Sequence, residues 1–228
     1  MTRLPHGDTA PSGGKTSSAS GDIAESVTAR SGHTGSGAAG RQGDILPVIL
    51  TLTGAVGLLA SWLLAVDGWN SLRNPGADLM CALGAGMDCA PAMDTWQARL
   101  LGFPNAYLGI GAFTVLTVVG VQWLSAGAPA RWFRRCLLLG SVAGMALVWF
   151  LMYTTVSSLP ALCPWCLVVW IAMWPALLFQ VDRGMQVGDV PASPGLARAV
   201  RAYRWAVLVV GYVLAAAVVV IGMPHLLR

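Results

Sequence analysis

The chain has 228 residues, of which 56% are hydrophobic and only 11% are charged, whereas soluble domains carry about 25% charged residues. This composition excludes a soluble globular protein. The net charge of +4 comes from basic residues dispersed between apolar runs, which excludes the continuous basic stripe of a nucleic-acid-binding protein. Five cysteines are too few for a miniprotein held together by disulfides, so any thiol chemistry has to come from particular pairs.

Residues 1–44 form a polar tail rich in Gly, Ser, Thr and Ala. Such a segment buries too little apolar surface to offset its ordering entropy, so we expect it to be disordered. A signal peptide has an apolar core directly after a basic start, but here the first apolar run begins only at Ile45. We therefore expect the tail to be retained and cytoplasmic, and residues 45–228 to form one membrane domain.

Five apolar stretches are long enough, or nearly so, to cross a membrane as helices, which takes about 20 residues. Because lipid offers backbone groups no hydrogen-bond partners, each stretch is expected to be a helix rather than an open strand. The sequence therefore predicts an all-α integral membrane protein. Its predicted spans cover about 45–66, 103–124, 136–157, 164–181 and 203–224. Small residues inside the spans, such as Gly54 and Gly140, are typical of closely packed membrane helices.

The distribution of Lys and Arg predicts the orientation of these spans. Eleven lie in the tail and in the segments 125–135 and 182–204, whereas three lie in the segments on the other side of the membrane. Since basic residues concentrate on the cytoplasmic side, the tail and those two segments are expected there. The loop 67–102, the turn 158–163 and the C-terminus then face the extracytoplasmic, oxidising compartment, where disulfide chemistry is possible.

Cys163-Pro164-Trp165-Cys166 places two sulfurs three residues apart at the extracytoplasmic start of the fourth span. On a helix such residues are neighbours, close enough for a disulfide after a small adjustment. Pro164 suits the first helical position and makes Cys163 the expected N-cap, where the helix dipole favours the reactive thiolate. An inert bridge or half of a metal site is the alternative at this spacing.

Cys81 and Cys89 form a second pair in the predicted outer loop, joined by a connector with two glycines. A flexible pair can reach both an external protein and the helix-borne pair, as thiol–disulfide exchange requires. A structural loop disulfide is the alternative. The four cysteines could together bind a metal, but the histidines lie in the tail or near the C-terminus, and we expect no metal site. Cys136, at the cytoplasmic end of the third span, is expected to be a small buried hydrophobe.

The order of these motifs resembles the bacterial form of the vitamin K epoxide reductase family. The loop pair comes first, then a G-x-P-N-x-x-x-G motif at 102–109, and then the C-x-x-C. The DsbB-type quinone reductases have similar chemistry, but their C-x-x-C precedes the other pair. The resemblance covers about 45–181. It implies a four-helix transmembrane bundle that holds a quinone, either menaquinone or ubiquinone, with a fifth transmembrane helix alongside.

The resemblance also implies a catalytic role for each cysteine. A reduced thioredoxin-fold partner would attack Cys81, and the resulting mixed disulfide would be resolved by Cys89. Electrons would pass from Cys89 to Cys163, and Cys166 would deliver them to the quinone. The chain ends at Arg228 without a fused thioredoxin-like domain, so we expect a separate, DsbA-like extracytoplasmic partner. The implied protein is a quinone reductase in the plasma membrane of a bacterium that reoxidises this partner.

Asn105, Met93 and Trp96 are the further residues expected at the quinone. Asn105 matches the family asparagine that hydrogen-bonds a quinone carbonyl, where an amide donor can stabilise developing charge; its alternative is a capping or interhelix hydrogen bond. The segment 94–97 resembles a capping box that opens a short helix, which in the family shields the quinone. Met93 and Trp96 would then lie over the ring, although interfacial anchoring also explains a tryptophan.

One departure from the family concerns the reaction. Four residues after Cys166 the animal enzymes carry a tyrosine linked to epoxide chemistry, whereas this chain has Trp170. We therefore expect quinone reduction rather than epoxide reduction. The alternatives from other classes are a transmembrane thiol electron carrier and a non-catalytic scaffold with structural disulfides or a metal.

Overall fold

The computed structural model describes residues 44–74, 79–82, 87–158 and 162–222. The expectations for the tail up to residue 43 and for the C-terminus after residue 222 lie outside these residues. Five of the described helices are long and apolar enough to cross a membrane, which confirms the all-α membrane fold. They are α2 (Leu46–Arg73), α4 (Asn105–Ala126), α5 (Arg131–Ser158), α6 (Pro164–Gln186) and α7 (Pro194–Gly222). Between α2 and α4 lie the short α3 (Ala90–Met93) and the 3-10 helix η1 (Trp96–Arg99).

Four helices extend by five residues or more beyond the apolar stretches that predicted them. α2 continues past residue 66 to Arg73 and α6 past residue 181 to Gln186, while α5 begins at Arg131 instead of 136 and α7 at Pro194 instead of 203. An apolar stretch marks only the part of a helix that suits hydrocarbon, whereas the hydrogen-bonded ladder continues until a stop signal or loop ends it. One consequence is that Asp67 lies inside α2 and not in a loop.

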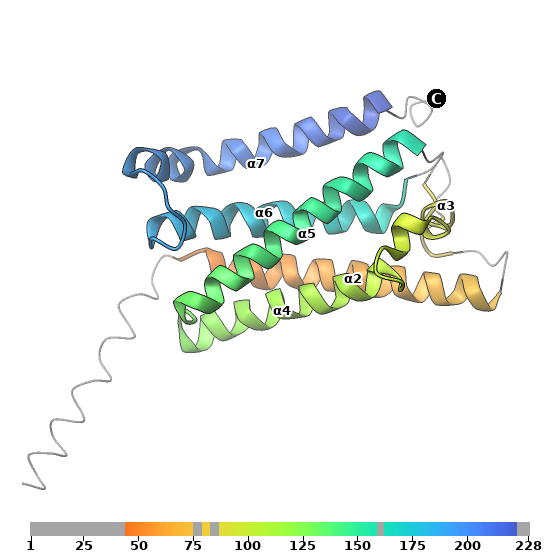
Figure 1. Ribbon diagram of the computed structural model, residues 1–228, viewed down its shortest axis with the longest axis horizontal. Coiled ribbons are helices and arrows are strands. Elements are labelled where there is room, and N and C mark those ends of the chain that lie inside the picture. Colours follow the sequence, from red (N-terminus) through yellow and green to blue (C-terminus); the bar gives the residue numbers. More distant parts are fainter. Residues whose placement is uncertain (1–43, 75–78, 83–86, 159–161, 223–228) are drawn as a thin grey trace, which may run out of the picture. The chain divides into compact units, whose positions relative to one another are not determined.

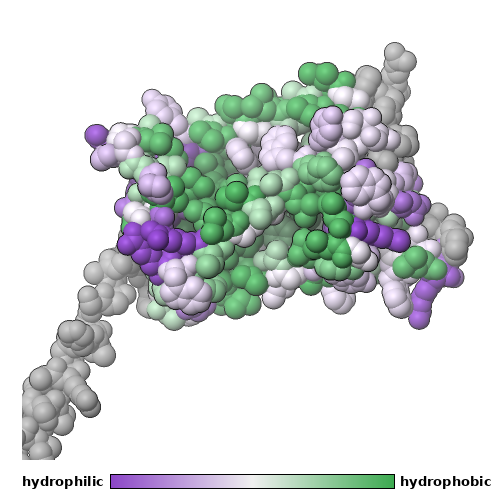
Figure 2. Space-filling view, viewed as in Figure 1, coloured by the Kyte–Doolittle hydropathy of each residue, from purple (hydrophilic) through white to green (hydrophobic). Residues whose placement is uncertain are grey.

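Four of the long helices form a bundle, and α7 lies along its side (Figure 1). α2 packs most extensively against α4 and also against α6, while α6 contacts α5 and α7 as well. The core consists mainly of buried apolar side chains from α2, α4, α5 and α6, and α7 contributes only Ala215 to the buried residues described. In Figure 2 hydrophobic residues cover the middle of the visible face and hydrophilic residues gather toward its ends. The expected four-helix bundle with a fifth helix is therefore confirmed.

Glycine makes the close contact between α2 and α4 possible. A Cβ atom on Gly54 would lie 2.7 Å from the backbone nitrogen of Thr117, and one on Gly120 would lie 2.6 Å from the backbone nitrogen of Thr51. Such approaches exclude any side chain, so each helix offers a glycine where the other backbone passes. Gly140 has a different surrounding, because a Cβ atom there would meet no atom within 4 Å.

Two hydrogen bonds join α7 to α6 around Pro175. Proline has no N–H, so the carbonyl of Ile171, four residues earlier, lacks its helical donor. The hydroxyl of Tyr212 donates to that carbonyl at 2.7 Å, and Nε1 of Trp174 donates to the carbonyl of Leu208 at 3.3 Å. Because backbone groups in hydrocarbon need partners within the protein, the proline in α6 gives α7 a defined place to attach.

Ion pairs gather where α6 ends and α5 begins, a region we call the arginine end of the bundle. The pairs join Arg131 and Arg134 to Asp189, Arg183 to Asp44, and Arg204 to Asp182, with N···O distances of 3.0, 2.7, 2.9 and 3.3 Å. Burial alone would raise the pKa of Asp189, but hydrogen bonds and charge from Arg134 and Arg131 outweigh it and lower that pKa. These pairs link the segment before α2, the start of α5 and the loop after α6.

Candidate redox site

Three cysteines meet at the opposite end of the bundle, which we call the cysteine end. Cys81, Cys89 and Cys163 are buried together in one cluster. Cys81 and Cys89 form a disulfide, whereas Cys163 and Cys166 are free. The Sγ atoms of Cys89 and Cys163 are 3.2 Å apart. The two cysteine pairs singled out in the sequence are therefore in direct contact.

Backbone pairing beside the cysteines produces this contact between residues 74 positions apart. Met87 forms an isolated parallel bridge with Leu162. The N–H of Asp88 donates to the carbonyl of Leu162 at 2.9 Å. Asp88 and Leu162 directly precede Cys89 and Cys163, so main-chain hydrogen bonding fixes how the two sulfurs face each other.

Cys163 is the N-cap of α6, and Pro164 occupies its first turn, as the sequence predicts. The Cys163 sulfur accepts a hydrogen bond from the N–H of Cys166 at 3.4 Å. Hydrogen bonds from the Cys166 side chain and from the backbone N–H groups of Cys166 and Trp165 lower the pKa of the Cys163 thiol, although burial and the charge of Asp67 oppose this. Because a thiol with a lowered pKa leaves a disulfide more readily, Cys163 is a suitable leaving group from a disulfide with Cys89.

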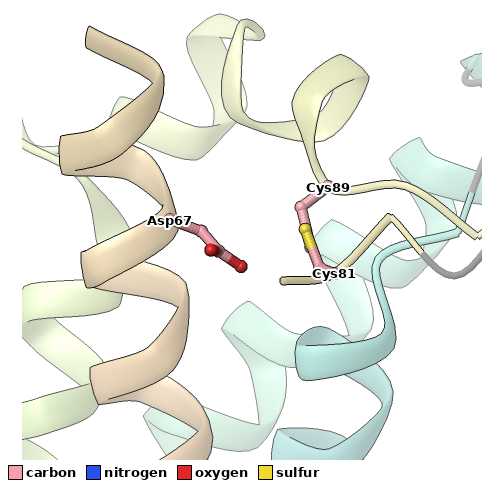
Figure 3. A group of neighbouring side chains, drawn as sticks. All are labelled: Asp67, Cys81 and Cys89. Atoms are coloured by element: carbon pink, nitrogen blue, oxygen red, sulfur yellow. A yellow bond between two sulfur atoms is a disulfide. The ribbon is translucent and has the colours of Figure 1, made fainter. Parts of the chain in front are cut away.

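Asp67 belongs to this site, although the sequence did not single it out. It is 0% exposed, and its two carboxylate oxygens accept hydrogen bonds from the N–H of Met80 and the indole N–H of Trp165, both at 3.1 Å. Met80 precedes Cys81 and Trp165 lies within the C-x-x-C, so Asp67 ties α2 to both redox segments. In Figure 3 its carboxylate lies between α2 and the disulfide. A lone carboxylate directly after an apolar span is the signal that could have identified it, because ionisable residues at such positions are often functional.

An apolar cavity of about 430 Å³ lies between α4, α5 and α6. Cys166 and Asn105 line one part of it, and it continues along α5 past Gly140 to Cys136. Its size lies within the range of small-molecule sites. Cys136 is exposed, which corrects the expectation that it is buried: beside the cavity its side chain meets open space.

A second cavity of about 150 Å³ shares Asn105 and Cys166 with the first and is also lined by Met93. The side-chain amide of Asn105 donates to the carbonyl of Gln97 at 2.7 Å. This bond ties η1 to the start of α4 and uses one of the two amide N–H groups, which leaves the other and the amide oxygen for a ligand. The structure thus brings Asn105 and Met93 to the same place as Cys166.

Trp96 lies apart from these residues. It is 68% exposed and lines neither of the two cavities. Thr95, and not Asp94, is the N-cap of η1, with its hydroxyl accepting from the N–H of Ala98 at 3.3 Å. Asp94 instead ends α3. The short helix therefore starts one residue later than the capping box suggested, and its tryptophan faces outward.

Trp170, four residues after Cys166, lines the larger cavity. Its ring packs edge-on against Trp149 and Tyr212, with centroids 6.1 and 6.4 Å away. Within the described residues its indole N–H has no hydrogen-bond partner. The position supplies an aromatic wall and no hydroxyl.

Similarity to known proteins identifies the family to which this arrangement belongs. Residues 48–181 match the vitamin K epoxide reductase family, whereas no curated protein and no solved structure gives a significant match. The matched range is more than half of the chain and contains both cysteine pairs, Asn105 and most of the helices that line the cavity. The chain therefore belongs to the vitamin K epoxide reductase family of membrane oxidoreductases, whose members use quinones as electron acceptors.

Proposed function

We propose that this protein reoxidises a separate, DsbA-like dithiol partner and passes the electrons through its two cysteine pairs to a quinone. The observation that carries the proposal is the 3.2 Å distance between the sulfurs of Cys89 and Cys163. Thiol–disulfide exchange requires one sulfur to attack another, and this contact supplies the geometry. A disulfide that only stapled the loop would need no second pair against it.

Electrons enter at the loop pair. A thiolate of the partner attacks Sγ of Cys81, which breaks the Cys81–Cys89 disulfide and releases Cys89 as a thiolate. The second partner thiolate, and not Cys89 as the resemblance implies, then attacks the partner's own sulfur in this mixed disulfide and releases Cys81, because attack by Cys89 would only restore the loop disulfide. The partner therefore leaves oxidised and the loop pair is reduced. Because Cys81 is fully buried, the partner can reach its sulfur only after residues around Cys81 move.

Transfer between the pairs follows. When Cys163 and Cys166 are joined in a disulfide, the Cys89 thiolate attacks Sγ of Cys163 and Cys166 leaves. Cys81 then attacks Sγ of Cys89, which restores the loop disulfide and releases Cys163. The described state, with a loop disulfide and free Cys163 and Cys166, corresponds to the end of this step.

The residues at the larger cavity fit a quinone. A quinone ring needs an apolar slot and one or two hydrogen-bond donors; Asn105 supplies an amide beside Cys166, and Met93 covers the same place from the smaller cavity. The open space at Gly140 leaves room for an isoprenoid chain. Reoxidation of Cys163 and Cys166 to a disulfide releases two electrons and two protons, which convert quinone to quinol. Menaquinone and ubiquinone both satisfy these requirements.

We place the protein in the plasma membrane of a bacterium, with the arginine end cytoplasmic and the cysteine end extracytoplasmic, because basic residues concentrate on the cytoplasmic side. A cysteine introduced at the exposed Ser193, near the arginine end, tests this orientation in a background where the free cysteines Cys136, Cys163 and Cys166 are replaced by serine. An impermeant maleimide should label it only after the membrane is permeabilised. Labelling in intact cells would show that the protein has the opposite orientation.

Turnover with purified components tests the relay. The oxidised protein is mixed with a reduced DsbA-like dithiol and a soluble quinone, and the quinone absorbance is followed for wild type, Cys166→Ser and Ser193→Ala, whose exposed position lines neither cavity. We expect dithiol-dependent quinone reduction in wild type and Ser193→Ala, and none in Cys166→Ser. A folded wild-type protein that turns over no menaquinone or ubiquinone analogue with any dithiol partner would contradict the proposal.

A further inference from the structure

Asp67, Cys81 and Cys89 bring three potential metal ligands together at the cysteine end. A carboxylate oxygen of Asp67 and the two sulfurs all lie within 4.8 Å of one another, and all three residues are buried. Figure 3 shows the carboxylate of α2 directed toward the disulfide. The sulfur of Cys163, 3.2 Å from that of Cys89, adds a fourth donor.

The surroundings of Asp67 resemble those of a metal-binding carboxylate. Each of its oxygens accepts one hydrogen bond from a neutral donor, Met80 N–H or Trp165 Nε1. Hydrogen bonds of this kind orient the ligands of metal sites, and each oxygen keeps a lone pair free. Within the described residues no Lys or Arg forms an ion pair with Asp67, so its negative charge is available to a cation.

The oxidation state of the loop pair decides whether the sulfurs can bind. In the disulfide they carry no charge and are poor ligands, whereas reduction creates two thiols beside Asp67 and Cys163. Deprotonation of these groups without a counter-ion would collect buried negative charge at high cost. A divalent, thiophilic cation removes that cost.

The spacing suits tetrahedral zinc. With Zn–S of about 2.3 Å and Zn–O of about 2.0–2.2 Å, neighbouring ligand atoms lie roughly 3.5–3.8 Å apart. The atoms of Asp67, Cys81 and Cys89 lie within 4.8 Å of one another and the sulfurs of Cys89 and Cys163 are 3.2 Å apart, so small movements bring them to this spacing. Three cysteines and one carboxylate are also donors that zinc accepts.

We propose that the reduced protein binds one Zn²⁺ through Cys81, Cys89, Cys163 and Asp67, and that the form with the loop disulfide does not. Binding displaces three thiol protons and moves no electrons. Because the bound sulfurs are no longer free nucleophiles, zinc holds the loop pair reduced and stops electron transfer. The site is therefore an inhibitory metal site whose affinity depends on redox state.

Cobalt titration of the full chain tests the proposal without quinone or partner. The protein in detergent is reduced with a phosphine, freed of reductant under anaerobic conditions and titrated with Co²⁺, and the oxidised protein is titrated in parallel. We expect one cobalt per reduced chain, with tetrahedral d–d bands and thiolate charge-transfer bands that Zn²⁺ abolishes. Equal binding by the oxidised form, or cobalt without these bands, would overturn it.

Variants identify the ligands. Asp67→Asn and Cys81→Ser should each weaken cobalt binding by at least about tenfold, while Cys136→Ser, far from the cluster, should bind as wild type. Circular dichroism checks that each variant is folded, and the comparison of reduced with oxidised wild type needs no variant. Unchanged affinity in both folded ligand variants would overturn the assignment.

The inhibitory consequence is measured separately. Micromolar Zn²⁺ should lower dithiol-dependent quinone reduction, and a chelator should restore it. If the protein binds cobalt as expected but reduces no quinone, the result contradicts the proposed electron relay and supports the metal site. If it reduces quinone but the reduced form binds no metal, the result supports the relay and contradicts the metal site.

Discussion

Buried aspartates occur at both ends of the bundle, but their partners differ. At the arginine end Asp182 and Asp189 are paired with guanidinium groups. At the cysteine end Asp67 accepts hydrogen bonds from two neutral N–H groups and, among the described residues, forms no ion pair. The positive charge of an arginine compensates the negative charge of a paired carboxylate. Neutral N–H donors leave that negative charge uncompensated. Aspartate thus joins segments of the chain through ion pairs at one end, and supplies negative charge beside reactive sulfurs at the other.

The largest expected effect comes from removing the sulfur that connects the two pairs. Cys163→Ala leaves the loop disulfide able to oxidise one partner dithiol, but steady-state quinone reduction should fall by about 10⁴-fold or more, as for other removed nucleophiles. Dithiol oxidation per chain and quinone absorbance are measured in the same sample. Continued turnover would show that electrons bypass the contact between Cys89 and Cys163.

Asp67→Asn tests the carboxylate of the cysteine end. The amide keeps the shape but can accept from only one of the two N–H donors, and loss of a hydrogen bond to a charged group costs about 1.5–3 kcal/mol. Transfer between the pairs should therefore slow by roughly 10- to 100-fold. Rapid quenching and thiol alkylation measure this step, and KM for the quinone should stay unchanged. A lower melting temperature with an unchanged rate of transfer between the cysteine pairs would show that Asp67 has only a structural role.

Arg134→Met tests the ion pairs at the other end. In this variant Asp189 still forms its ion pair with Arg131, but the Arg131 side chain is largely exposed and compensates only weakly for the lost pair. We therefore expect the free energy of unfolding to fall by about 1–3 kcal/mol. Thermal unfolding in detergent measures the loss, with quinone reduction per folded molecule unchanged. Arg135→Met is the matched control, since its described contact is a long 3.5 Å hydrogen bond to the Gly188 carbonyl. Equal destabilisation by both variants would remove the special role of the Asp189 pair.

The smallest effect concerns pH at the arginine end. The pKa of Asp189 is lower in the folded protein than its ordinary value, so its stabilising contribution is complete above the ordinary aspartate pKa of about 4 and is lost as pH falls through the lower, folded value. The melting temperature of wild type should therefore decrease on acidification more steeply than that of Asp189→Asn. Parallel curves for the two proteins would contradict this assignment.

Local sequence rules predicted the parts of the site that depend on neighbours in the chain. Apolar length gave the five spans, and Pro164 after Cys163 gave the N-cap, because both follow from the chemistry of adjacent residues. The contact of Cys89 with Cys163 spans 74 positions and depends on the pairing of Met87 with Leu162, which no local pattern encodes.

Two further features depend on small shifts at the ends of elements. The sequence ended the first span at residue 66, so it assigned Asp67 to a loop, whereas the continued α2 carries it to the cysteines. It began the short helix at Asp94, and the actual cap at Thr95 leaves Trp96 exposed. One residue at a boundary decides which side chain reaches a site.

The cap on α6 has a mechanical consequence. The Cys163 sulfur holds the N–H of Cys166 only as an electron-rich acceptor, and in a disulfide with Cys89 or Cys166 it carries less negative charge. We therefore expect the first turn of α6 to be held less tightly when Cys163 is in a disulfide than in the described form with free Cys163. Amide hydrogen exchange at Cys166 should then be faster in the disulfide form, and comparison of the two forms would measure the difference.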